Sequence, residues 1–323
     1  MLKTAEYLLT ASLVFVIVAF ITNLIVMTSG PKVVRRTPAK KLATVGAAGD
    51  DDLEDDIPVA EDDDHDAELA ELDDEVPVAP AKATPKSALN IGLFATGFTI
   101  MAWVLLTAYL GMRIVLTGHG PFSNMHEFAV SFVWGILAAY LVAFWRFKVR
   151  MLSIPVLVVS GGLQVYALVW AGGTDVEPLV PALQNNLLLT LHVGFAVLSY
   201  GAACVSFGAA LLWLIYPHLK MKTPRDKLDE IGYKGAVVAF PLMTIMILLG
   251  ALWANTAWGR PWGWDPKETA ALVTWLVYAG FLHARVSRGW RGKRAAWMLV
   301  IGFAAVMFAY FGNYFFGGLH SYG

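Results

Sequence analysis

Long hydrophobic runs alternate with short polar stretches along most of this 323-residue chain. A helix needs about 20 mostly apolar residues to cross the roughly 30 Å hydrocarbon core of a bilayer. Eight segments meet this criterion, at about residues 7–28, 89–111, 126–146, 151–171, 186–216, 235–254, 267–284 and 295–316. The pattern therefore predicts an all-α polytopic membrane protein with about eight transmembrane helices.

A polar segment rich in Ala, Pro, Asp and Glu interrupts this pattern at residues 29–88, and 16 of the 25 acidic residues lie between Asp50 and Glu75. Such a segment cannot bury enough apolar surface to offset the entropy lost on ordering. We predict a first transmembrane helix at residues 1–28, a disordered acidic linker at 29–88, and a seven-helix domain at 89–323. The linker either binds a cytoplasmic partner or is simply solvated.

Composition supports the membrane assignment, because 57% of the residues are hydrophobic and only 15% are charged. Soluble domains carry nearer about 25% charged residues. The single cysteine, Cys204, lies in an apolar run, where it is expected to pack, and no disulfide framework is possible. No CxxCH sequence occurs, so the chain is not itself a c-type cytochrome. No nucleic-acid partner is expected.

The basic residues predict the orientation in the membrane. Twenty of the 24 Lys and Arg residues fall in one alternating set of loops, and only Lys3, Arg113, Arg260 and Lys267 fall on the other side. Because cytoplasmic loops are enriched in Lys and Arg, both termini are expected outside and the linker inside. The expected location is the plasma membrane.

Tryptophan is concentrated in residues 253–268, on the predicted outer side between the sixth and seventh helices. An interfacial aromatic belt would explain tryptophans at this level. Gly and Pro residues among them instead favour a shaped loop, and flat aromatic faces beside small residues suit a large planar apolar ligand. Arg260 could pair with a carboxylate of that ligand. The tryptophans are Trp253, Trp258, Trp262 and Trp264.

The sequence Asp265-Pro266-Lys267-Glu268 has the features of a helix start. Asp265 is a suitable N-cap, Pro266 occupies the first helical position, and Glu268 follows the cap by three residues. This pattern predicts a capping box that opens the seventh helix. Asp265 is therefore expected mainly to fix the junction between loop and helix, which would also position the tryptophans.

Two histidines belong to the same predicted membrane face as the tryptophan loop. His192 lies about a turn and a half inside the outer end of the fifth helix, and His320 follows the eighth helix. Taken singly, each is more often a structural residue. Together, two neutral imidazoles on either side of a porphyrin would complete octahedral iron coordination.

The remaining outer and inner histidines are harder to interpret. His283 lies 18 residues after Asp265, which is about 27 Å along a helix, so it cannot share a site with the outer pair. It is either an interfacial residue beside Arg285 or a second, inner ligand. His119 and His126 lie in the outer loop before the third helix, and no role is assigned to them.

Residues 253–268 and the flanking histidines resemble the tryptophan-rich WWD signature of heme-handling proteins. The order of motifs, with Pro121-Phe122-Ser123-Asn124-Met125 upstream and Leu319-His320 at the end, resembles the CcsA/ResC subunit of System II cytochrome c synthetase. Some lineages, including actinobacteria, call this subunit CcsB. The resemblance covers roughly residues 90 to 323. The first helix and the acidic linker extend beyond it.

Specific roles follow from the resemblance. It implies that His192 and His320 are the external axial heme ligands, and that His283 binds heme on its way outward, with a second histidine from a partner subunit. The remaining matched residues form the signature that positions heme for transfer: Trp253, Trp258, Trp262, Trp264 and Asp265.

The resemblance also implies an activity, in which the chain binds and translocates heme b and presents it on the extracytoplasmic face for thioether attachment to the CxxCH of apocytochrome c. Expected partners are a CcsB/ResB-type membrane subunit, apocytochrome c and thiol-reducing pathway proteins. With that subunit the chain would act as a holocytochrome c synthase, or heme lyase. One alternative is a heme transporter that delivers heme to a separate ligase. Another is a structural subunit whose tryptophan loop is only interfacial.

Overall fold

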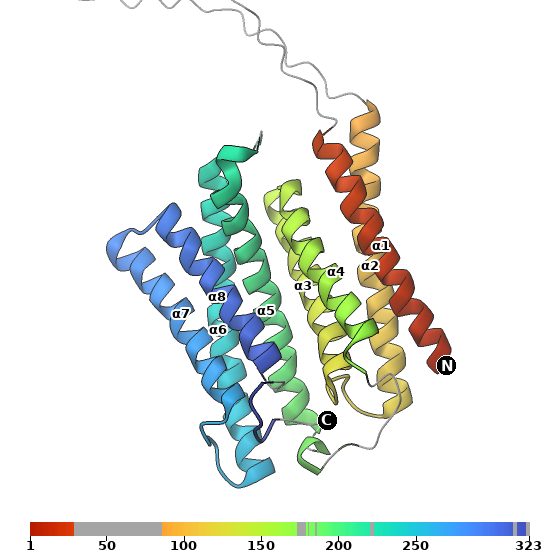
Figure 1. The fold of residues 1–323 in the computed structure, drawn as a ribbon, viewed down its shortest axis with the longest axis vertical. Helices are drawn as coiled ribbons and strands as arrows, with labels where there is room; N and C mark the ends of the chain where they lie inside the picture. The colour runs from red at the N-terminus through yellow and green to blue at the C-terminus, as the bar shows by residue number, and fades with distance from the viewer. Residues whose placement is uncertain are drawn as a thin grey trace, which may run out of the picture. The chain divides into compact units, whose positions relative to one another are not determined.

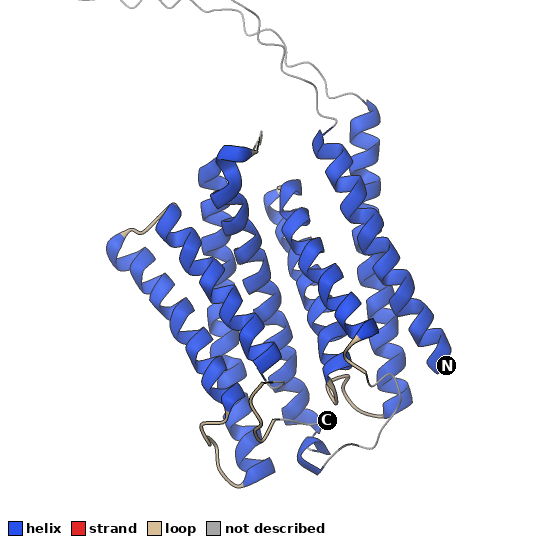
Figure 2. Ribbon diagram, viewed as in Figure 1, coloured by secondary structure: helices blue, strands red, loops and turns tan. Residues whose placement is uncertain are grey.

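Eight long α-helices form the fold of the described residues, which are 1–28, 86–172, 179, 181–184, 186–219, 223–312 and 315–320 of a computed structural model. Each helix is long and apolar enough to cross a membrane, and no strand occurs within these residues (Figures 1 and 2). The predicted all-α polytopic fold is therefore confirmed. The helices are α1 (Leu2–Thr28), α2 (Lys86–Thr117), α3 (Met125–Phe147), α4 (Ser153–Val169), α5 (Asn186–Ile215), α6 (Arg225–Trp258), α7 (Pro266–Arg288) and α8 (Lys293–Phe311).

The helix bounds differ most from the prediction at α6, which begins at Arg225 rather than near residue 235. Its first turns are polar, and hydropathy alone places the start of the apolar run too late. Asp229 holds these turns in place, because its carboxylate pairs with Arg285 at 2.6 Å and accepts the Gly292 N–H at 3.0 Å. Helix α8 is shorter than predicted, since it ends at Phe311 rather than near residue 316.

Helix α5 is central to the bundle, since 78% of its most apolar stretch is buried, against 28% for α1. It packs against α3, α4, α6 and α8. A Cβ atom added at Gly201 would lie only 2.4 Å from the Gly135 carbonyl oxygen, so α3 and α5 approach backbone to backbone. Small residues commonly allow such close helix packing within membranes.

The first helix is packed into the bundle, against α2 and α4. Ser12 Oγ in α1 donates to the Ala102 carbonyl oxygen in α2 at 3.0 Å and accepts from Gln164 Nε2 in α4 at 3.4 Å. These buried contacts tie α1 to its neighbours through polar groups. The predicted acidic linker falls almost entirely within residues 29–85, which lie outside the described residues.

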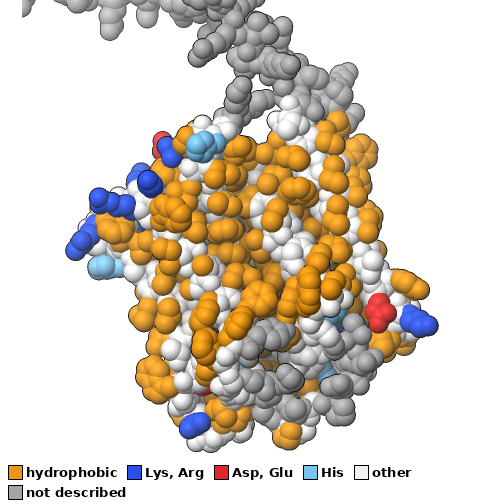
Figure 3. Space-filling view, in the orientation of Figure 1, with side chains coloured by type: hydrophobic (Ala, Val, Ile, Leu, Met, Phe, Trp, Pro, Cys, Tyr) orange, Lys and Arg blue, Asp and Glu red, His pale blue; other side chains and the backbone are white. Residues whose placement is uncertain are grey.

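Several connections gather at one end of the bundle. The start of α1, the α2–α3 connection, the α6–α7 connection and residues 315–320 all lie at this end (Figure 1). In the space-filling view a broad apolar surface covers the middle of the visible face, and most of its Lys and Arg side chains lie toward the opposite end (Figure 3). The end that carries the tryptophan loop is thus the one poorer in basic residues.

Candidate functional site

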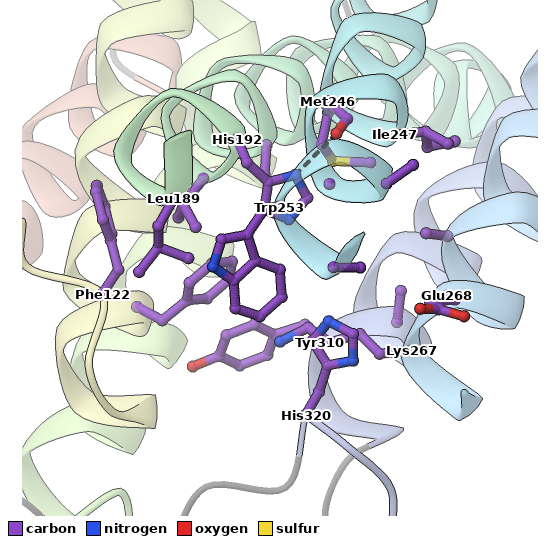
Figure 4. Close-up of a pocket in the computed structure, with 18 of the residues that line it drawn as sticks. Phe122, Leu189, His192, Met246, Ile247, Trp253, Lys267, Glu268, Tyr310 and His320 are labelled. Atoms are coloured by element: carbon purple, nitrogen blue, oxygen red, sulfur yellow. Dashed lines mark hydrogen bonds between the residues drawn. The ribbon is translucent and has the colours of Figure 1, made fainter. Parts of the chain in front are cut away.

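A cavity lies among α3, α5, α6, α7 and α8, the α6–α7 connection and the segment that carries His320 (Figure 4). It contains about 960 Å³ of empty space, including its open mouth. Four of its lining residues are histidine, lysine or glutamate: His192, Lys267, Glu268 and His320. Most of the others are apolar or aromatic, among them Phe122, Phe128, Leu189, Trp253, Trp262 and Tyr310. Such a lining, apolar with a few convergent polar groups, is typical of a small-molecule site.

His192 is positioned by the contact between α5 and α6. Its Nδ1 lies 2.8 Å from the Met246 carbonyl oxygen. Because a carbonyl oxygen can only accept, Nδ1 carries the proton and the lone pair of the neutral ring is on Nε2. A Cβ atom at Gly250 would approach the ring to 2.7 Å, so only glycine leaves room for the imidazole at this helix crossing.

Trp253 joins the two histidines of the predicted outer pair. The indole is 2% exposed, lies parallel to the His192 ring at 6.3 Å between centroids, and lies 5.7 Å from the His320 ring (Figure 4). Trp258 packs edge-on against both Trp253, at 4.7 Å, and His320, at 4.8 Å. The structure therefore brings together both imidazoles and two of the predicted tryptophans.

The other two predicted tryptophans lie in the turn before α7. Trp262 lines the cavity, and Trp264 packs edge-on against it at 5.7 Å. Trp264 is 69% exposed and has a positive φ of 56°, which is uncommon for a residue with a side chain. The turn that places Trp262 at the cavity thus includes an unfavourable backbone conformation at Trp264.

Asp265 performs the predicted capping role and a further one. Its carboxylate accepts the Lys267 N–H at 2.9 Å, and a capping box with Glu268 is present. The same carboxylate accepts the His320 Nδ1–H at 2.9 Å and the Leu319 N–H at 2.6 Å. One side chain therefore both starts α7 and orients the second imidazole.

The ionisation of this pair follows from burial and hydrogen bonding. Burial raises the pKa of the Asp265 carboxyl, but hydrogen bonds from His320, Lys267 and Leu319 lower it more, to about 2. Burial lowers the pKa of His320 below its ordinary value, although the Asp265 contact partly offsets this. At neutral pH the contact joins a neutral imidazole to a carboxylate, with the ring's lone pair on Nε2.

Two predicted residues lie away from the cavity. Arg260 is exposed and does not line it, and a Cβ atom at Gly263 would lie 3.0 Å from the Arg260 Nε. His283 is exposed near the far end of α7, as the predicted separation from the outer pair requires. Neither residue contributes to the site around Trp253.

The two histidines without an assigned role are buried beside the α2–α3 connection. His119 Nδ1 lies 2.7 Å from the Gly120 carbonyl oxygen. His126 is fully buried, with Nδ1 at 2.9 Å from the Ala167 carbonyl oxygen and Nε2 at 2.7 Å from the Tyr109 hydroxyl. Both ring nitrogens of His126 are thus engaged by the protein.

Sequence reasoning missed several cavity residues. Lys267 entered only as part of a capping sequence, although its side chain lines the cavity. Tyr310 in α8 also lines it and donates to the Met125 carbonyl oxygen at 3.1 Å. Met246 and Gly250 lie one turn apart on the α6 face that meets His192, a rotation that no sequence signal fixes.

The donor set suits the iron of a planar macrocycle. His192 and His320 come from separate elements, and each donates its Nδ1–H to a protein oxygen, as iron-binding and zinc-binding histidines commonly do. Among the described residues, no group of three or more His, Cys, Asp or Glu side chains is placed to hold a metal ion. A macrocycle that brings its own equatorial ligands and lies against indole faces fits this arrangement better than a bare ion.

Comparison with known proteins places the chain in a class. The family model of the cytochrome C assembly protein matches residues 122–320, a span that begins at Phe122 and ends at His320. The chain belongs to this family of cytochrome c assembly proteins.

Individual relatives narrow the assignment to the CcsA type. Cytochrome c biogenesis protein CcsA of Guillardia theta is 35% identical over 268 residues, covering 74% of this chain and 88% of the relative. The protein of the same name from Microcystis aeruginosa is 34% identical over 298 residues, covering 75% and 90%. The resemblance inferred from the tryptophan segment is confirmed, and with it a role in cytochrome c biogenesis.

Proposed function

We propose that this chain binds heme b in the cavity, with His192 and His320 as the axial iron ligands, and presents it for covalent attachment to apocytochrome c. The observation that carries this proposal is the convergence of two neutral, oriented imidazoles on one buried indole in an apolar cavity. Membership of a cytochrome c biogenesis family supports it, because that process involves heme.

The chemistry asks little of acid–base groups. A thiol of the CxxCH segment adds across a heme vinyl group: a sulfur–carbon bond forms, the hydrogen goes to the other vinyl carbon, and nothing is oxidised or reduced overall. Such an addition depends above all on proximity and orientation. The cavity residues would supply both, and the histidine of the CxxCH segment would replace one axial ligand. No general acid is assigned.

The proposal places the cavity on the extracytoplasmic face of the plasma membrane. The cavity lies at the end of the bundle poorer in basic residues, and cytoplasmic ends are usually enriched in Lys and Arg. Both chain ends would then lie outside, with residues 29–88 inside. Thioether formation there requires reduced cysteines, so thiol-reducing proteins are included among the proposed partners.

His283 is included as an inner heme ligand. Its exposed side chain near the far end of α7 is accessible to a second subunit, as a site shared with a CcsB/ResB-type partner requires. Heme would pass from this inner position to the outer cavity. With that partner, the chain would constitute a heme lyase.

The test is an absorption spectrum of the purified complex, followed by incubation with a CxxCH peptide. The native complex is expected to show six-coordinate, bis-imidazole heme and to form a thioether product. His192→Ala and His320→Ala variants, present at normal protein levels, are expected to lose both. If both variants keep bound heme and c-type cytochromes, the cavity is not the heme site and the tryptophan loop is structural.

The same assay separates ligation from delivery. If the complex with its partner binds heme with the expected spectrum but forms no thioether until a separate ligase is added, the chain is a heme delivery protein. Attachment by the complex alone supports the lyase. Lys234→Gln, an exposed substitution on α6, serves as the matched control.

A further inference from the structure

Lys267 brings a positive charge to the cavity without a matching negative partner. Its side chain lines the cavity, and its ammonium lies 5.3 Å from the centroid of the Phe128 ring (Figure 4). Within the described part of the chain, no hydrogen bond or ion pair engages the Nζ atom. An ammonium held against an aromatic face in an apolar cavity is costly unless an anion accompanies it.

The two neighbouring carboxylates are already in use. Asp265 accepts hydrogen bonds from His320 and from two backbone N–H groups. Glu268 accepts the N–H groups of Gly263, at 2.8 Å, and Asp265, at 3.2 Å, through the same oxygen. These bonds hold both carboxylates to the start of α7, and neither forms a salt bridge with the Lys267 ammonium.

A second polar group in the cavity also lacks a partner. Trp253 is 2% exposed, and its indole Nε1 is buried with no hydrogen-bond acceptor among the described residues. The nitrogen lies on the side of the ring that faces Leu189, away from Lys267 (Figure 4). An unsatisfied buried N–H is uncommon in proteins, and a bound water or ligand with an acceptor would satisfy it. The cavity thus offers two unmatched donors, one of them charged.

These donors address a problem that axial ligation leaves open. Two imidazoles on one iron fix the axis through the metal, but they do not fix rotation about that axis or which face is turned to which ligand. Apolar walls barely distinguish one edge of the macrocycle from another. Heme b carries two carboxylates on one edge and its vinyl groups elsewhere, so a single off-axis cation can set the orientation.

We propose that Lys267 binds a propionate carboxylate of the heme and thereby positions the vinyl groups for attachment. This inference rests on the proposed heme-binding function and adds a positioning residue to it. The role falls to Lys267 rather than to Arg260, because only the lysine lines the cavity. The ammonium acts through the carboxylate edge and takes no part in the addition of sulfur to carbon.

The experiment compares ferric heme b with its dimethyl ester, which keeps the iron and both vinyl groups but has no carboxylate. Each is titrated into the full-length chain with its partner subunit in phosphatidylcholine nanodiscs. The wild type is expected to bind the diacid about tenfold to hundredfold more tightly than the ester, the range for a charge-assisted hydrogen bond. Lys267→Gln is expected to reduce this preference to near unity while keeping the six-coordinate spectrum.

Three further variants make the comparison specific. Lys267→Arg keeps the charge and is expected to retain most of the preference. Lys234→Gln removes an exposed lysine far from the cavity and is expected to behave as wild type. Arg260→Gln removes a cation from the same loop, and if it rather than Lys267→Gln abolishes the preference, Arg260 binds the carboxylate and the proposal is wrong.

Other outcomes are equally informative. If the wild type binds diacid and ester alike, and phosphatidylglycerol in the nanodisc competes with both, the ammonium holds a lipid headgroup and the proposal fails. If neither form gives a six-coordinate spectrum, it is the heme-binding function itself that fails. As an independent readout, the propionate bending band in resonance Raman spectra is expected to shift in Lys267→Gln, a change that loss of helix capping would not produce.

Discussion

Two histidines of the same bundle, the fully buried His126 and the partly buried His192, differ in how their ring nitrogens are hydrogen-bonded. In His126, Nδ1 is hydrogen-bonded to the carbonyl oxygen of Ala167 and Nε2 is hydrogen-bonded to the Tyr109 hydroxyl. In His192, Nδ1 donates to the carbonyl oxygen of Met246, and within the described residues Nε2 has no hydrogen-bond partner. The two imidazoles therefore differ in whether the protein engages both ring nitrogens or only one.

The surroundings of the two histidines differ in the same way. Glu127 follows His126 in sequence and forms a buried ion pair with Arg113, and Ser123 donates to the same carboxylate at 2.7 Å. The His192 cavity instead holds an ammonium and an indole N–H without acceptors. The cluster beside His126 is thus saturated with hydrogen bonds within the protein, whereas the cavity keeps two donors that a ligand with acceptor atoms could engage.

The largest expected effect comes from replacing each histidine by leucine. His192→Leu is expected to reduce bound heme by more than the roughly 10–100-fold that loss of a supporting partner costs a metal site. His126→Leu leaves a buried hydroxyl and a buried carbonyl unpaired, so it is expected to cost about 1–3 kcal/mol for each. In the His126→Leu variant, the amount of heme bound per folded molecule should stay unchanged.

Heme content by pyridine hemochrome assay and thermal denaturation in detergent measure the two effects separately. The proposed difference between the two histidines is contradicted if His126→Leu loses heme at normal protein levels, or if His192→Leu retains heme. Either result would show that hydrogen-bond saturation does not identify the ligand.

A smaller effect is expected from Asp265→Asn. Asparagine caps helices about as well as aspartate, so α7 should lose little stability. The amide oxygen can still accept from His320 and Lys267, but the amide nitrogen cannot accept from Leu319, so the segment that carries His320 loses a backbone hydrogen bond and the ring is held less firmly. Bound heme is expected to fall about 10–100-fold. Equal loss of heme and of thermal stability would instead mean that Asp265 acts only as a cap.

The smallest effect concerns pH. Burial lowers the pKa of His320 below 6.5, so its contribution to stability is complete above pH 6.5 and declines as the pH falls toward the folded-state value. Asp265, Lys267 and Glu268 are the charged groups that act on it. The contribution of Asp265 is complete above pH 3.8 and is lost toward pH 2. The heme spectrum is therefore expected to stay constant from pH 8 to 6.5, and a midpoint above 6.5 would contradict this.

Much of the fold could be predicted from hydropathy, because a membrane span must be continuously apolar and of a set length. The predicted bounds were least accurate where a helix begins outside its apolar run. Helix α6 starts at Arg225, and Asp229 in its polar first turns pairs with Arg285, a contact between residues 56 positions apart that hydropathy cannot reveal. The domain organisation around residues 29–88 stays a prediction, since these residues lie almost wholly outside the described part.

The site divides along a similar line. His192, His320 and Asp265 could be proposed from residue type and from the side of the membrane on which they fall. Lys267 and Arg260 fall on the same side, and only the rotation of α7 and the course of the preceding turn decide that the lysine side chain lines the cavity. Sequence therefore indicated which chemistry gathers at this end, but could not say which of two cations joins it.

The glycine at position 250 gives the site an asymmetry. His192 is held at the contact between α5 and α6 by the Met246 carbonyl and lies against Gly250, whereas His320 belongs to the non-helical residues 315–320 and bonds the Asp265 carboxylate. One histidine of the pocket is thus held by two helices, and the other is held by a non-helical segment. If heme binds as proposed, we expect an incoming imidazole to replace His320 rather than His192, because His320 lies outside the helices.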